Sequence, residues 1–348
     1  MSTRVPPEQA RRELALPDEA LARYLETALP GFRGPLSSSK FSGGQSNPTY
    51  RLDAASGRYV LRRKPPGSLL ASAHAVDREF RVLQALHGSP VPVARPLHLC
   101  RDDGVIGSMF YVMEYVDGRV FWDPALPELN AEQRGACYQA LVATLAALHS
   151  LDVEAIGLSG YGKPGNYFAR QIARWTEQYR ASQTRPIPAM DVLADKLAAR
   201  CPADDGAVAL VHGDYRIDNL MFDAGGGRVL AVVDWELSTL GHPLADLGYL
   251  CMALRLPRNP ALPGLAGLDR GELGIPDEVR LLQDYARLSG RPIPTDWPFV
   301  LGFSYFRLAA IAQGVARRAE QGNASSARAS EAGRMTAMLA DAGLAQLR

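Results

Sequence analysis

The feature that most restricts the fold lies between residues 208 and 236, where short apolar runs alternate with polar loops. The apolar runs lie at 208–211, 220–222 and 229–233, and a Gly225-Gly-Gly turn separates the last two. Short apolar runs bounded by turn residues are typical of buried strands. We therefore expect one small sheet, with the loop 212–219 and residue Asp234 at the same end of it.

The polar residues at this end predict a particular chemistry. The loop reads His212-Gly-Asp214-Tyr-Arg216-Ile-Asp-Asn219, and Asp234 follows the third apolar run. Two carboxylates and one amide oxygen are hard ligands, which suit Mg²⁺ and phosphate-bearing substrates. A carboxylate five residues before an amide is the spacing used in phosphoryl transfer. We expect Asp214 to be the catalytic base, and Asn219 and Asp234 to be the metal ligands.

Two other residues of this loop carry weaker signals. Arg216 lies two residues after the predicted base, where a fixed positive charge would stabilise the transferring phosphoryl group. His212 follows a buried strand, a position where histidine more often supports the scaffold than acts as a base. We therefore predict a catalytic role for Arg216 and a role for His212 in holding the shape of the loop.

Residues 1–116 predict a smaller lobe of strands with one helix. A glycine-rich turn running into a strand is expected at 41–52, followed by a five-residue hairpin loop at 53–57 and a strand at 58–63. A helix is expected at 72–87, and two further strands at 97–100 and 109–116. Glu79 lies on the apolar face of that helix, where a carboxylate needs a cation beside it. Arg62 on the preceding strand is the expected partner, with Arg63 as the alternative. In kinases such a pair positions the α- and β-phosphates, and an ordinary surface ion pair is the other reading.

Two further segments of this lobe are candidates for nucleotide contacts. Gly43-Gly44-Gln45-Ser46 precedes a strand, and its backbone N–H groups would lie over phosphates; an ordinary turn is the alternative. The Glu114 carbonyl and the Val116 N–H, just before a predicted lobe boundary at Asp117-Gly118, would pair with an adenine edge. A buried edge strand without a ligand is equally compatible with that pattern.

Residues 117–348 predict a larger, mostly helical lobe. Asn130 and Gln133 form a capping-box pattern at the start of one helix. Further helices are expected at 277–288, 299–318 and 330–347, and a loop or lid at 257–276. The whole pattern predicts an α+β fold of two lobes with a cleft between them. The lobes are a nucleotide-binding lobe at 1–116, with a helical extension at its N-terminus, and a catalytic and substrate-binding lobe at 117–348.

This ordered set of motifs resembles the phosphotransferase enzyme family, the aminoglycoside phosphotransferase-like proteins with a protein-kinase-like fold. The resemblance runs from about Phe41 to Arg318, and its most specific parts are the 212–219 loop and Asp234-Trp-Glu. It implies a five-stranded antiparallel N-terminal lobe, ATP and Mg²⁺ as cofactors, and Arg62 with Glu79 as the nucleotide-positioning pair. It also implies that Asp246, in Pro243-Leu-Ala-Asp-Leu-Gly, braces the catalytic loop.

One branch of that family is more similar than the others. Ser42-Gly-Gly-Gln-Ser-Asn, Leu61-Arg-Arg-Lys-Pro-Pro-Gly67 and the 212–219 loop resemble the kinase-like domains fused to, or encoded beside, acyl-CoA dehydrogenases. Members of this branch are implicated in phosphorylating hydroxylated acyl-CoAs. Arg62 stands where many kinases use lysine, Trp235-Glu236 replaces Phe-Gly, and no Ala-Pro-Glu segment follows. These departures argue against a protein kinase.

The amino-acid composition restricts the binding partners and the cellular location that we expect for the protein. The 348 residues carry 38 basic and 37 acidic side chains, a balance that argues against nucleic-acid binding. Apolar runs of about eight residues, an N-terminus without an export signal and four cysteines without a Cys-x-x-Cys pair predict a cytoplasmic protein that does not span a membrane. Residues 251–348 hold twelve arginines and no lysine against nine acidic residues, which favours a neutral or anionic substrate.

The leading hypothesis is an ATP- and Mg²⁺-dependent phosphotransferase acting on a hydroxyl group of a small molecule, such as a hydroxyacyl-CoA or a hydroxy acid. GTP remains an alternative nucleotide, and the oligomeric state stays open. An aminoglycoside or other antibiotic phosphotransferase is the nearest alternative. A catalytically inactive nucleotide-binding regulatory protein is the alternative of another class, and the intact Asp214, Asn219 and Asp234 argue against it. A dinucleotide oxidoreductase is disfavoured because no βαβ unit follows Gly43-Gly44.

Overall fold

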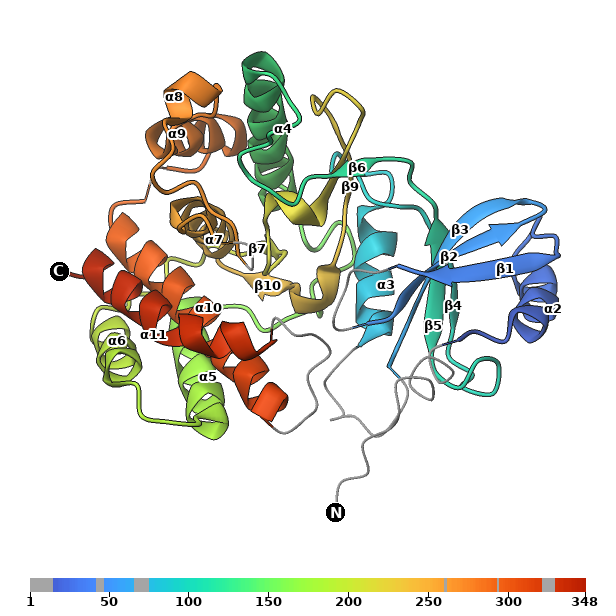
Figure 1. Cartoon of the computed structure of the whole chain (residues 1–348), viewed down its shortest axis with the longest axis horizontal. Helices are drawn as coiled ribbons and strands as arrows, with labels where there is room; N and C mark the ends of the chain where they lie inside the picture. Colours follow the sequence, from blue (N-terminus) through green and yellow to red (C-terminus); the bar gives the residue numbers. More distant parts are fainter. Residues whose placement is uncertain (1–14, 42–46, 66–74, 260–261, 293, 321–328) are drawn as a thin grey trace. The chain divides into compact units, whose positions relative to one another are not determined.

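The computed structural model describes residues 15–41, 47–65, 75–259, 262–292, 294–320 and 329–348. The chain divides into two compact units, whose elements are labelled in Figure 1. The N-terminal unit comprises residues 1–117 together with 233–236, and the C-terminal unit comprises 118–232 together with 237–348. Asp234 therefore belongs by its contacts to the N-terminal unit, although it follows strands of the other unit in the sequence.

The N-terminal unit is built on one antiparallel sheet with the strand order β1-β2-β3-β5-β4. Its strands are β1 Leu36–Lys40, β2 Thr49–Ala54, β3 Gly57–Arg63, β4 Pro96–Cys100 and β5 Phe110–Glu114. Its helices are α2 Asp18–Ala28 and α3 Val76–Leu86. The predicted five-stranded antiparallel sheet with a helix before its fourth strand is confirmed. Helix α2 lies in the N-terminal stretch where a helical extension was predicted, whereas β1 lies outside the segments for which the sequence predicted an element.

The turn between β2 and β3 is shorter than predicted. The register pairs Ala54 with Gly57, so the loop has only the two residues between them and the five-residue loop predicted at 53–57 is wrong. Gly57 has a φ of 136°, a conformation open mainly to glycine. This glycine lets the two strands pair to the very end of the hairpin.

Each strand places alternate side chains on opposite faces of the sheet. Leu61 and Val112 are cross-strand partners in a core cluster that also contains Leu21 and Leu25 of α2. The next residues along, Arg62 and Tyr111, are also partners and point to the other face, where α3 packs against β4 and β5. The period of the strands therefore directs Arg62 towards α3.

The C-terminal unit is mainly helical. Its longer helices are α4 Ala131–His149, α5 Tyr167–Ser182, α6 Pro188–Ala199, α7 Leu244–Arg255, α9 Glu278–Ser289, α10 Trp297–Glu320 and α11 Ala329–Gln346. The capping box at the start of α4 is confirmed. The Asn130 side chain accepts the backbone N–H of Gln133, and the Gln133 side chain accepts the backbone N–H of Asn130. The segment 257–276, predicted as a loop, contains the one-turn helix α8 Arg270–Leu273, because the Asp269 carboxylate accepts the Glu272 N–H at 3.1 Å.

The short strands of this unit form two sheets, so the single sheet predicted from the sequence is wrong. One sheet has the order β6-β8-β9 and the other pairs β10 with β7. The strands are β6 Arg119–Val120, β7 Ala209–Val211, β8 Leu220–Phe222, β9 Val229–Val232 and β10 Thr239–Gly241. A 3-10 turn, η1 Ile217–Asn219, redirects the chain between β7 and β8, and β7 pairs instead with β10.

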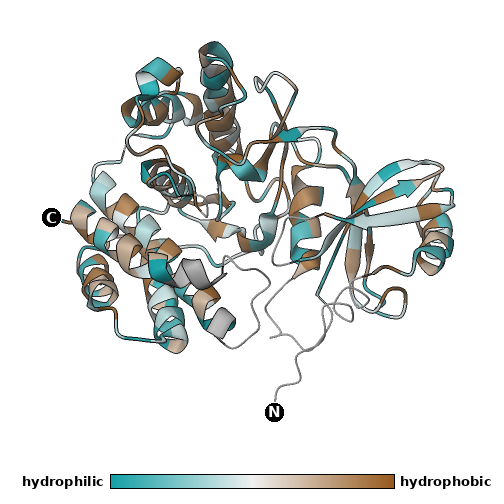
Figure 2. Ribbon diagram, in the orientation of Figure 1, coloured by the Kyte–Doolittle hydropathy of each residue, from teal (hydrophilic) through white to brown (hydrophobic). Residues whose placement is uncertain are grey.

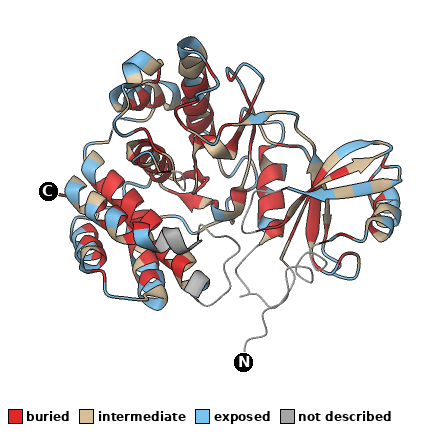
Figure 3. Ribbon diagram, viewed as in Figure 1, coloured by how far each residue is buried: buried red, intermediate tan, exposed pale blue. Residues whose placement is uncertain are grey.

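The core of the C-terminal unit surrounds α10, which packs against α5, α6, α7 and α11. Hydrophobic and buried residues run along this helix in Figures 2 and 3. Within the described part of the chain, α10 is the one helix long and apolar enough to cross a membrane, but 83% of its apolar window is buried inside the protein. Its composition is accounted for by this position at the centre of the helical core.

Candidate functional site

The N-terminal unit brings three carboxylates together around the guanidinium group of Arg62. Arg62 Nε lies 2.9 Å from a Glu79 carboxylate oxygen, and Arg62 Nη2 lies 2.6 Å from Asp234 Oδ1 and 3.7 Å from Glu236 Oε2. The predicted ion pair of Arg62 with Glu79 is therefore present. Arg63 is not the partner, because it points to the other face and its Nε donates to Ser108 Oγ at 2.9 Å.

Glu79 is held by side chains from several elements. Its own side chain is only 2% exposed, on the face of α3 that contacts the sheet. Asn47 donates to one of its oxygens at 2.6 Å, and the Tyr111 hydroxyl donates to the other at 3.3 Å. Asn47, just before β2, and Tyr111 on β5 were not identified from the sequence, because only the paired strands bring them next to α3.

Burial and the neighbouring charges act in opposite directions on the pKa of Glu79. Burial raises the pKa of Glu79, and Arg62 with the hydrogen bond from Asn47 lowers that pKa only in part. The negative charge of Asp234 raises it further. Among the ion pairs of the described residues, this one guanidinium lies within 4.0 Å of three carboxylates, Glu79, Asp234 and Glu236.

Asp234 has an unusual backbone. Its φ is 66°, a left-handed conformation that few residues other than glycine adopt, and its side chain is 34% exposed. Strained backbone of this kind is frequent at functional sites. Arg62 holds Oδ1, and within the described residues Oδ2 has no hydrogen-bond partner. The carboxylate is therefore fixed in place with one oxygen available.

In the C-terminal unit, Asp214 and Asn219 lie side by side in the 212–219 loop, as the sequence predicts. Asn219 Nδ2 donates to the Asp214 backbone carbonyl at 2.8 Å and to Asp214 Oδ2 at 2.9 Å. The 3-10 turn η1 ends at Asn219 and folds the loop back so that these groups meet. The Asp214 side chain is 28% exposed. The Asn219 side chain therefore orients Asp214 through its Nδ2 group, while its Oδ1 takes no part in these two hydrogen bonds.

Arg216 is committed to carboxylates of its own loop. Its Nη2 donates to Asp218 Oδ2 at 2.5 Å, and its Nε lies 3.8 Å from Asp214 Oδ1. Burial raises the pKa of Asp218, and Arg216 opposes that rise. The sequence analysis did not single out Asp218. The observed contacts show Arg216 beside Asp214, while its role toward a phosphoryl group stays a prediction.

Asp246, on α7, holds the 212–219 loop in place through hydrogen bonds to its backbone. Its two carboxylate oxygens accept the backbone N–H groups of His212 at 2.6 Å and Gly213 at 2.8 Å. His212 Nδ1 in turn accepts the Asp214 N–H at 3.1 Å. Gly213 has a φ of 86°, and a Cβ there would lie 2.5 Å from the Leu237 carbonyl oxygen. The bracing role expected for Asp246 and the scaffold role expected for His212 are both confirmed.

A buried network behind Asp246 was not identified from the sequence. His149, at the end of α4, has Nε2 3.3 Å from Asp246 Oδ2 and Nδ1 2.8 Å from the Tyr285 hydroxyl of α9. Burial lowers the pKa of His149. Burial alone would raise the pKa of Asp246, but the His149 hydrogen bond, the histidine charges and the Gly213 N–H lower it overall. The network links α4 and α9 to the 212–219 loop.

The remaining predicted contacts stay predictions. Gly43, Gly44, Gln45 and Ser46 lie outside the described residues. The Glu114 N–H donates to the Arg95 carbonyl at 2.9 Å at the end of β5, and Val116 follows in an irregular segment. These observations leave the Glu114 carbonyl and the Val116 N–H as candidates for binding an adenine edge.

The donor set fits a magnesium ion. The described residues contain no group of three or more His, Cys, Asp or Glu side chains arranged to hold a metal. Mg²⁺ needs no such cage, since proteins commonly bind it through one or two carboxylates together with phosphates of the substrate. Asn219 and Asp234 each retain an oxygen without a hydrogen bond from the described residues. Each of these residues therefore offers the type of oxygen that Mg²⁺ accepts, and their role as metal ligands stays a prediction.

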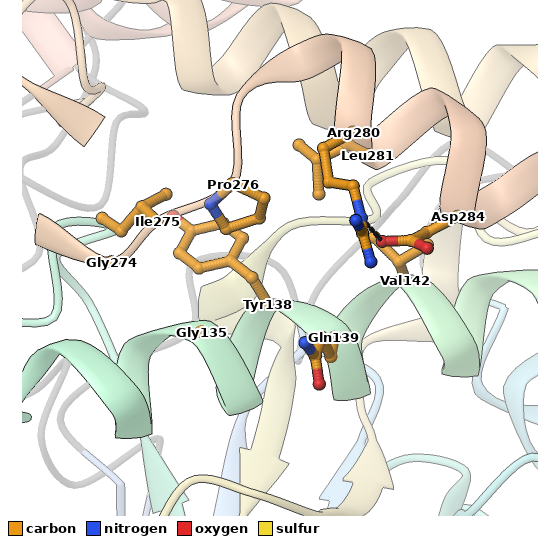
Figure 4. A pocket seen from close by; sticks show the side chains of 10 residues that line it. All are labelled: Gly135, Tyr138, Gln139, Val142, Gly274, Ile275, Pro276, Arg280, Leu281 and Asp284. Carbon is orange, nitrogen blue, oxygen red and sulfur yellow. Dashed lines mark hydrogen bonds and ion pairs between the residues drawn. The ribbon is translucent and has the colours of Figure 1, made fainter. Parts of the chain in front are cut away.

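A separate pocket of about 320 Å³ lies between α4 and the segment that leads into α9. Figure 4 shows Tyr138 and Gln139 of α4 on one side, and Pro276 and the ion pair of Arg280 with Asp284 on the other. None of the predicted site residues lines it. The candidate functional site is therefore distinct from this pocket.

Comparison with curated proteins places the chain beside parts of longer proteins. It is 45% identical over 333 residues to mouse acyl-CoA dehydrogenase family member 10, covering 95% of this chain and 31% of that protein. It is also 45% identical over 345 residues to chicken acyl-CoA dehydrogenase family member 11, covering 97% of this chain and 44% of that protein. The chain thus spans less than half the length of these relatives.

Solved structures give a consistent fold. A crystal structure of a candidate aminoglycoside phosphotransferase from Ralstonia eutropha has 48% sequence identity and a TM-score of 0.86, covering 96% of this chain and 98% of that one. Aminoglycoside phosphotransferase APH(4)-Ia, in a complex with AMP-PNP and hygromycin B, has 16% identity and a TM-score of 0.62, covering 94% and 98%. The second likeness shows the kinase-like fold alone. The model of the phosphotransferase enzyme family matches residues 38–289, and the chain belongs to that family.

Proposed function

We propose that this protein transfers the γ-phosphoryl group of ATP to a hydroxyl group of a small molecule in a reaction that requires Mg²⁺. The observation that carries the proposal is the catalytic loop, in which Asn219 holds the Asp214 carboxylate at 2.9 Å while Asp246 fixes the preceding backbone. A braced carboxylate beside an amide oxygen is the arrangement that phosphoryl transfer to a hydroxyl requires.

Each residue has a stated part in this reaction. Asp214 orients the acceptor hydroxyl and accepts its proton as the hydroxyl oxygen bonds to the γ-phosphorus and the bond from that phosphorus to the bridging oxygen of ADP breaks. Asn219 and Asp234 would hold Mg²⁺, which when bound neutralises charge on the β- and γ-phosphates. Arg62, fixed by Glu79, supplies positive charge to the nucleotide phosphates in place of the usual lysine.

The relatives support the choice of acceptor. The acyl-CoA dehydrogenase names of the curated relatives favour a hydroxyacyl-CoA or a hydroxy acid. The name of the Ralstonia structure favours a second candidate, an aminoglycoside. The twelve arginines and no lysine against nine acidic residues over 251–348 favour the first candidate, because a polycation needs acidic surroundings.

The test is nucleotide consumption by the full chain with ATP and Mg²⁺ against hydroxyacyl-CoAs, hydroxy acids and aminoglycosides. Asp214→Asn keeps the size of the side chain and its contact with Asn219 but removes the base, so we expect turnover to fall by about 10²–10⁴-fold. Asp195→Asn, at an exposed position of α6, is the matched control and should retain wild-type turnover. Wild-type turnover by Asp214→Asn would refute the assignment.

A further inference from the structure

Tyr249 is a buried tyrosine of α7 that is absent from the predicted catalytic machinery. It lies three residues after Asp246, and residues three apart share one face of a helix. The Asp246 carboxylate accepts the backbone N–H groups of His212 and Gly213. The face of α7 that carries Tyr249 is therefore the face that holds the start of the 212–219 loop.

Arg307, on α10, connects Tyr249 with this loop. Its Nη2 donates to the backbone carbonyl of Gly213, the residue before Asp214. Its guanidinium carbon lies 5.2 Å from the ring centre of Tyr249 and 5.6 Å from that of Trp175 on α5. One guanidinium thus contacts both the Tyr249 ring and the peptide bond that leads into Asp214.

The hydroxyl end of Tyr249 lies beside the predicted base. A hydrogen bond joins the phenol to the Asp214 carboxylate. Burial raises the pKa of this phenol above its ordinary value, the negative charge of Asp214 raises it further, and the positive charge of Arg216 opposes the rise. A phenol that keeps its proton is the donor in this hydrogen bond, and the carboxylate is the acceptor.

This contact differs from the other contacts of the Asp214 carboxylate. Asn219 Nδ2 donates to Oδ2 at 2.9 Å, and Arg216 Nε lies 3.8 Å from Oδ1, which is longer than a hydrogen bond. Asn219 and Arg216 belong to the same loop as Asp214, whereas Tyr249 belongs to α7. Tyr249 therefore ties the carboxylate of the predicted base to a helix outside its own loop, and a helix holds a site more precisely than a loop does.

We propose that Tyr249 is a positioning residue for the phosphoryl transfer, whose hydroxyl holds the Asp214 carboxylate in the orientation that receives the proton of the acceptor hydroxyl. This inference rests on the proposed function and deepens it by assigning part of the orientation of the base to α7. The proton passes to Asp214 as the hydroxyl oxygen bonds to the γ-phosphorus and the bond from that phosphorus to ADP breaks, while Tyr249 keeps its own proton throughout. A misplacement of about 1 Å can slow such a step on the order of 10²-fold.

A purely structural role of Tyr249 predicts a different result. If its hydroxyl only stabilises the core, its loss lowers the stability of the protein and leaves the turnover of the folded molecules unchanged. If the hydroxyl orients Asp214, its loss lowers kcat, leaves KM for ATP near the wild-type value, and has little effect once the carboxylate has been removed. The split between kcat and KM and the dependence on Asp214 therefore separate the two roles.

The experiment uses Tyr249→Phe in the full chain, which removes the hydroxyl and keeps the ring that Arg307 contacts. Turnover is measured with ATP, Mg²⁺ and whichever hydroxyacyl-CoA, hydroxy acid or aminoglycoside the wild type phosphorylates fastest. We expect kcat to fall about 10–100-fold, with KM for ATP changed by less than about twofold. In the Asp214→Asn background, the same substitution should change turnover by less than about twofold.

Tyr138→Phe is the matched control. It removes the hydroxyl of another buried tyrosine, which donates to the Pro124 carbonyl at 2.6 Å, and Tyr138 lies outside the candidate functional site. This variant should lose stability as one buried hydrogen bond is lost, and it should retain the wild-type kcat.

A second measurement needs no substrate. Chemical denaturation gives the equilibrium constant of unfolding for the wild type, Tyr249→Phe, Asp214→Ala and the double variant. We expect Tyr249→Phe to raise this constant about tenfold when Asp214 is present and less than about twofold when it is absent, since a hydrogen bond to a charged group is lost only in the first case.

Each outcome supports or overturns the inference. A wild-type kcat in folded Tyr249→Phe, or an equal loss of turnover with and without the Asp214 carboxylate, would overturn it. If Tyr249→Phe does not fold, Tyr249→His decides by the same loss of kcat, because its N–H donors lie closer to the backbone than the phenol hydroxyl. ADP formation by the wild type without coupling between Tyr249 and Asp214 in unfolding would leave the proposed function standing and remove Tyr249 from it. Coupling without ADP formation from any acceptor would instead refute the proposed function, and the contact would then have no part in catalysis.

Discussion

Two buried carboxylates, one in each unit, are stabilised in opposite ways. Glu79 in the N-terminal unit is 2% exposed and depends on side chains, namely Arg62, Asn47 and Tyr111. Asp246 in the C-terminal unit is fully buried; its oxygens contact His149 Nε2 and accept the backbone N–H groups of His212 and Gly213. The pKa of Glu79 is raised by burial, whereas the pKa of Asp246 is lowered despite burial.

The difference follows from how the donors are shared. Arg62 divides its charge among Glu79, Asp234 and Glu236, so the stabilisation that any one carboxylate receives is incomplete. The His149 contact and the two backbone donors, which are fixed by the fold, all serve Asp246, and together they make its ionised form the favoured one. The shared guanidinium therefore responds to any new charge placed beside Asp234, while the backbone clamp sets a rigid shape for the loop.

The comparison predicts the largest effect for Asp246→Ala. Its loss leaves two buried N–H donors and His149 without an acceptor, so we expect the free energy of unfolding to fall by about 3–5 kcal/mol. Chemical denaturation of the full chain measures this change. Asp195→Ala, at an exposed position of α6, should change the same quantity by less than about 0.5 kcal/mol. A loss of under 1 kcal/mol for Asp246→Ala would contradict the rigid-clamp interpretation.

The next largest effect is expected for Arg62→Met. Removing the guanidinium leaves Glu79 buried without its cation, but protonation of Glu79, whose pKa is already raised, limits the loss to about 2–3 kcal/mol. Arg62→Lys should recover part of this loss, since it keeps the charge without the fork. Arg58→Met is the control on the same strand, because the ion pair of Arg58 with Asp117 is exposed and should contribute under about 1 kcal/mol. Equal losses for Arg58→Met and Arg62→Met would contradict the comparison.

Some features of the fold and the site could be predicted from the sequence, whereas others could not. The 212–219 loop, the capping box at Asn130 and the ion pair of Arg62 with Glu79 were predictable because their signals lie in local spacing and in the period of one helix or strand. The strand β1 has the sequence Leu-Ser-Ser-Ser-Lys, which carries no alternation of apolar and polar residues. Its position in the sheet is decided by pairing with β2, which no local pattern encodes.

Long-range pairing also accounts for what was missed at the site. Residues 209–211 pair with 239–241, so β7 does not belong to the sheet that contains β8 and β9. His149 and Tyr285 meet across 136 residues of sequence. Arg307 lies inside a long apolar helix pattern, where one arginine carries no signal until its neighbours from α5 and α7 are known.

The smallest expected effect is a pH dependence of opposite sign at the two carboxylates. The folded-state pKa of Glu79 lies above the ordinary value of 4.5, so the unfolded chain ionises first as the pH rises. Relative to Glu79→Gln, the wild type should therefore lose stability as the pH rises from 4.5 through the folded-state pKa. Asp246 has a folded-state pKa below 3.8, so relative to Asp246→Asn the wild type should lose stability as the pH falls below 3.8.

Denaturation curves of the wild type and both variants at several pH values measure the two slopes. Each unit of pKa difference between the folded and unfolded chain changes the free energy of unfolding by about 1.4 kcal/mol, so the slopes are within reach of this method. Asp195→Asn, exposed on α6, should follow the wild type throughout. Slopes of the same sign for Glu79 and Asp246 would mean that Arg62 stabilises ionised Glu79 as fully as His149 and the backbone donors stabilise ionised Asp246. The shared guanidinium could then not explain the difference between the two units.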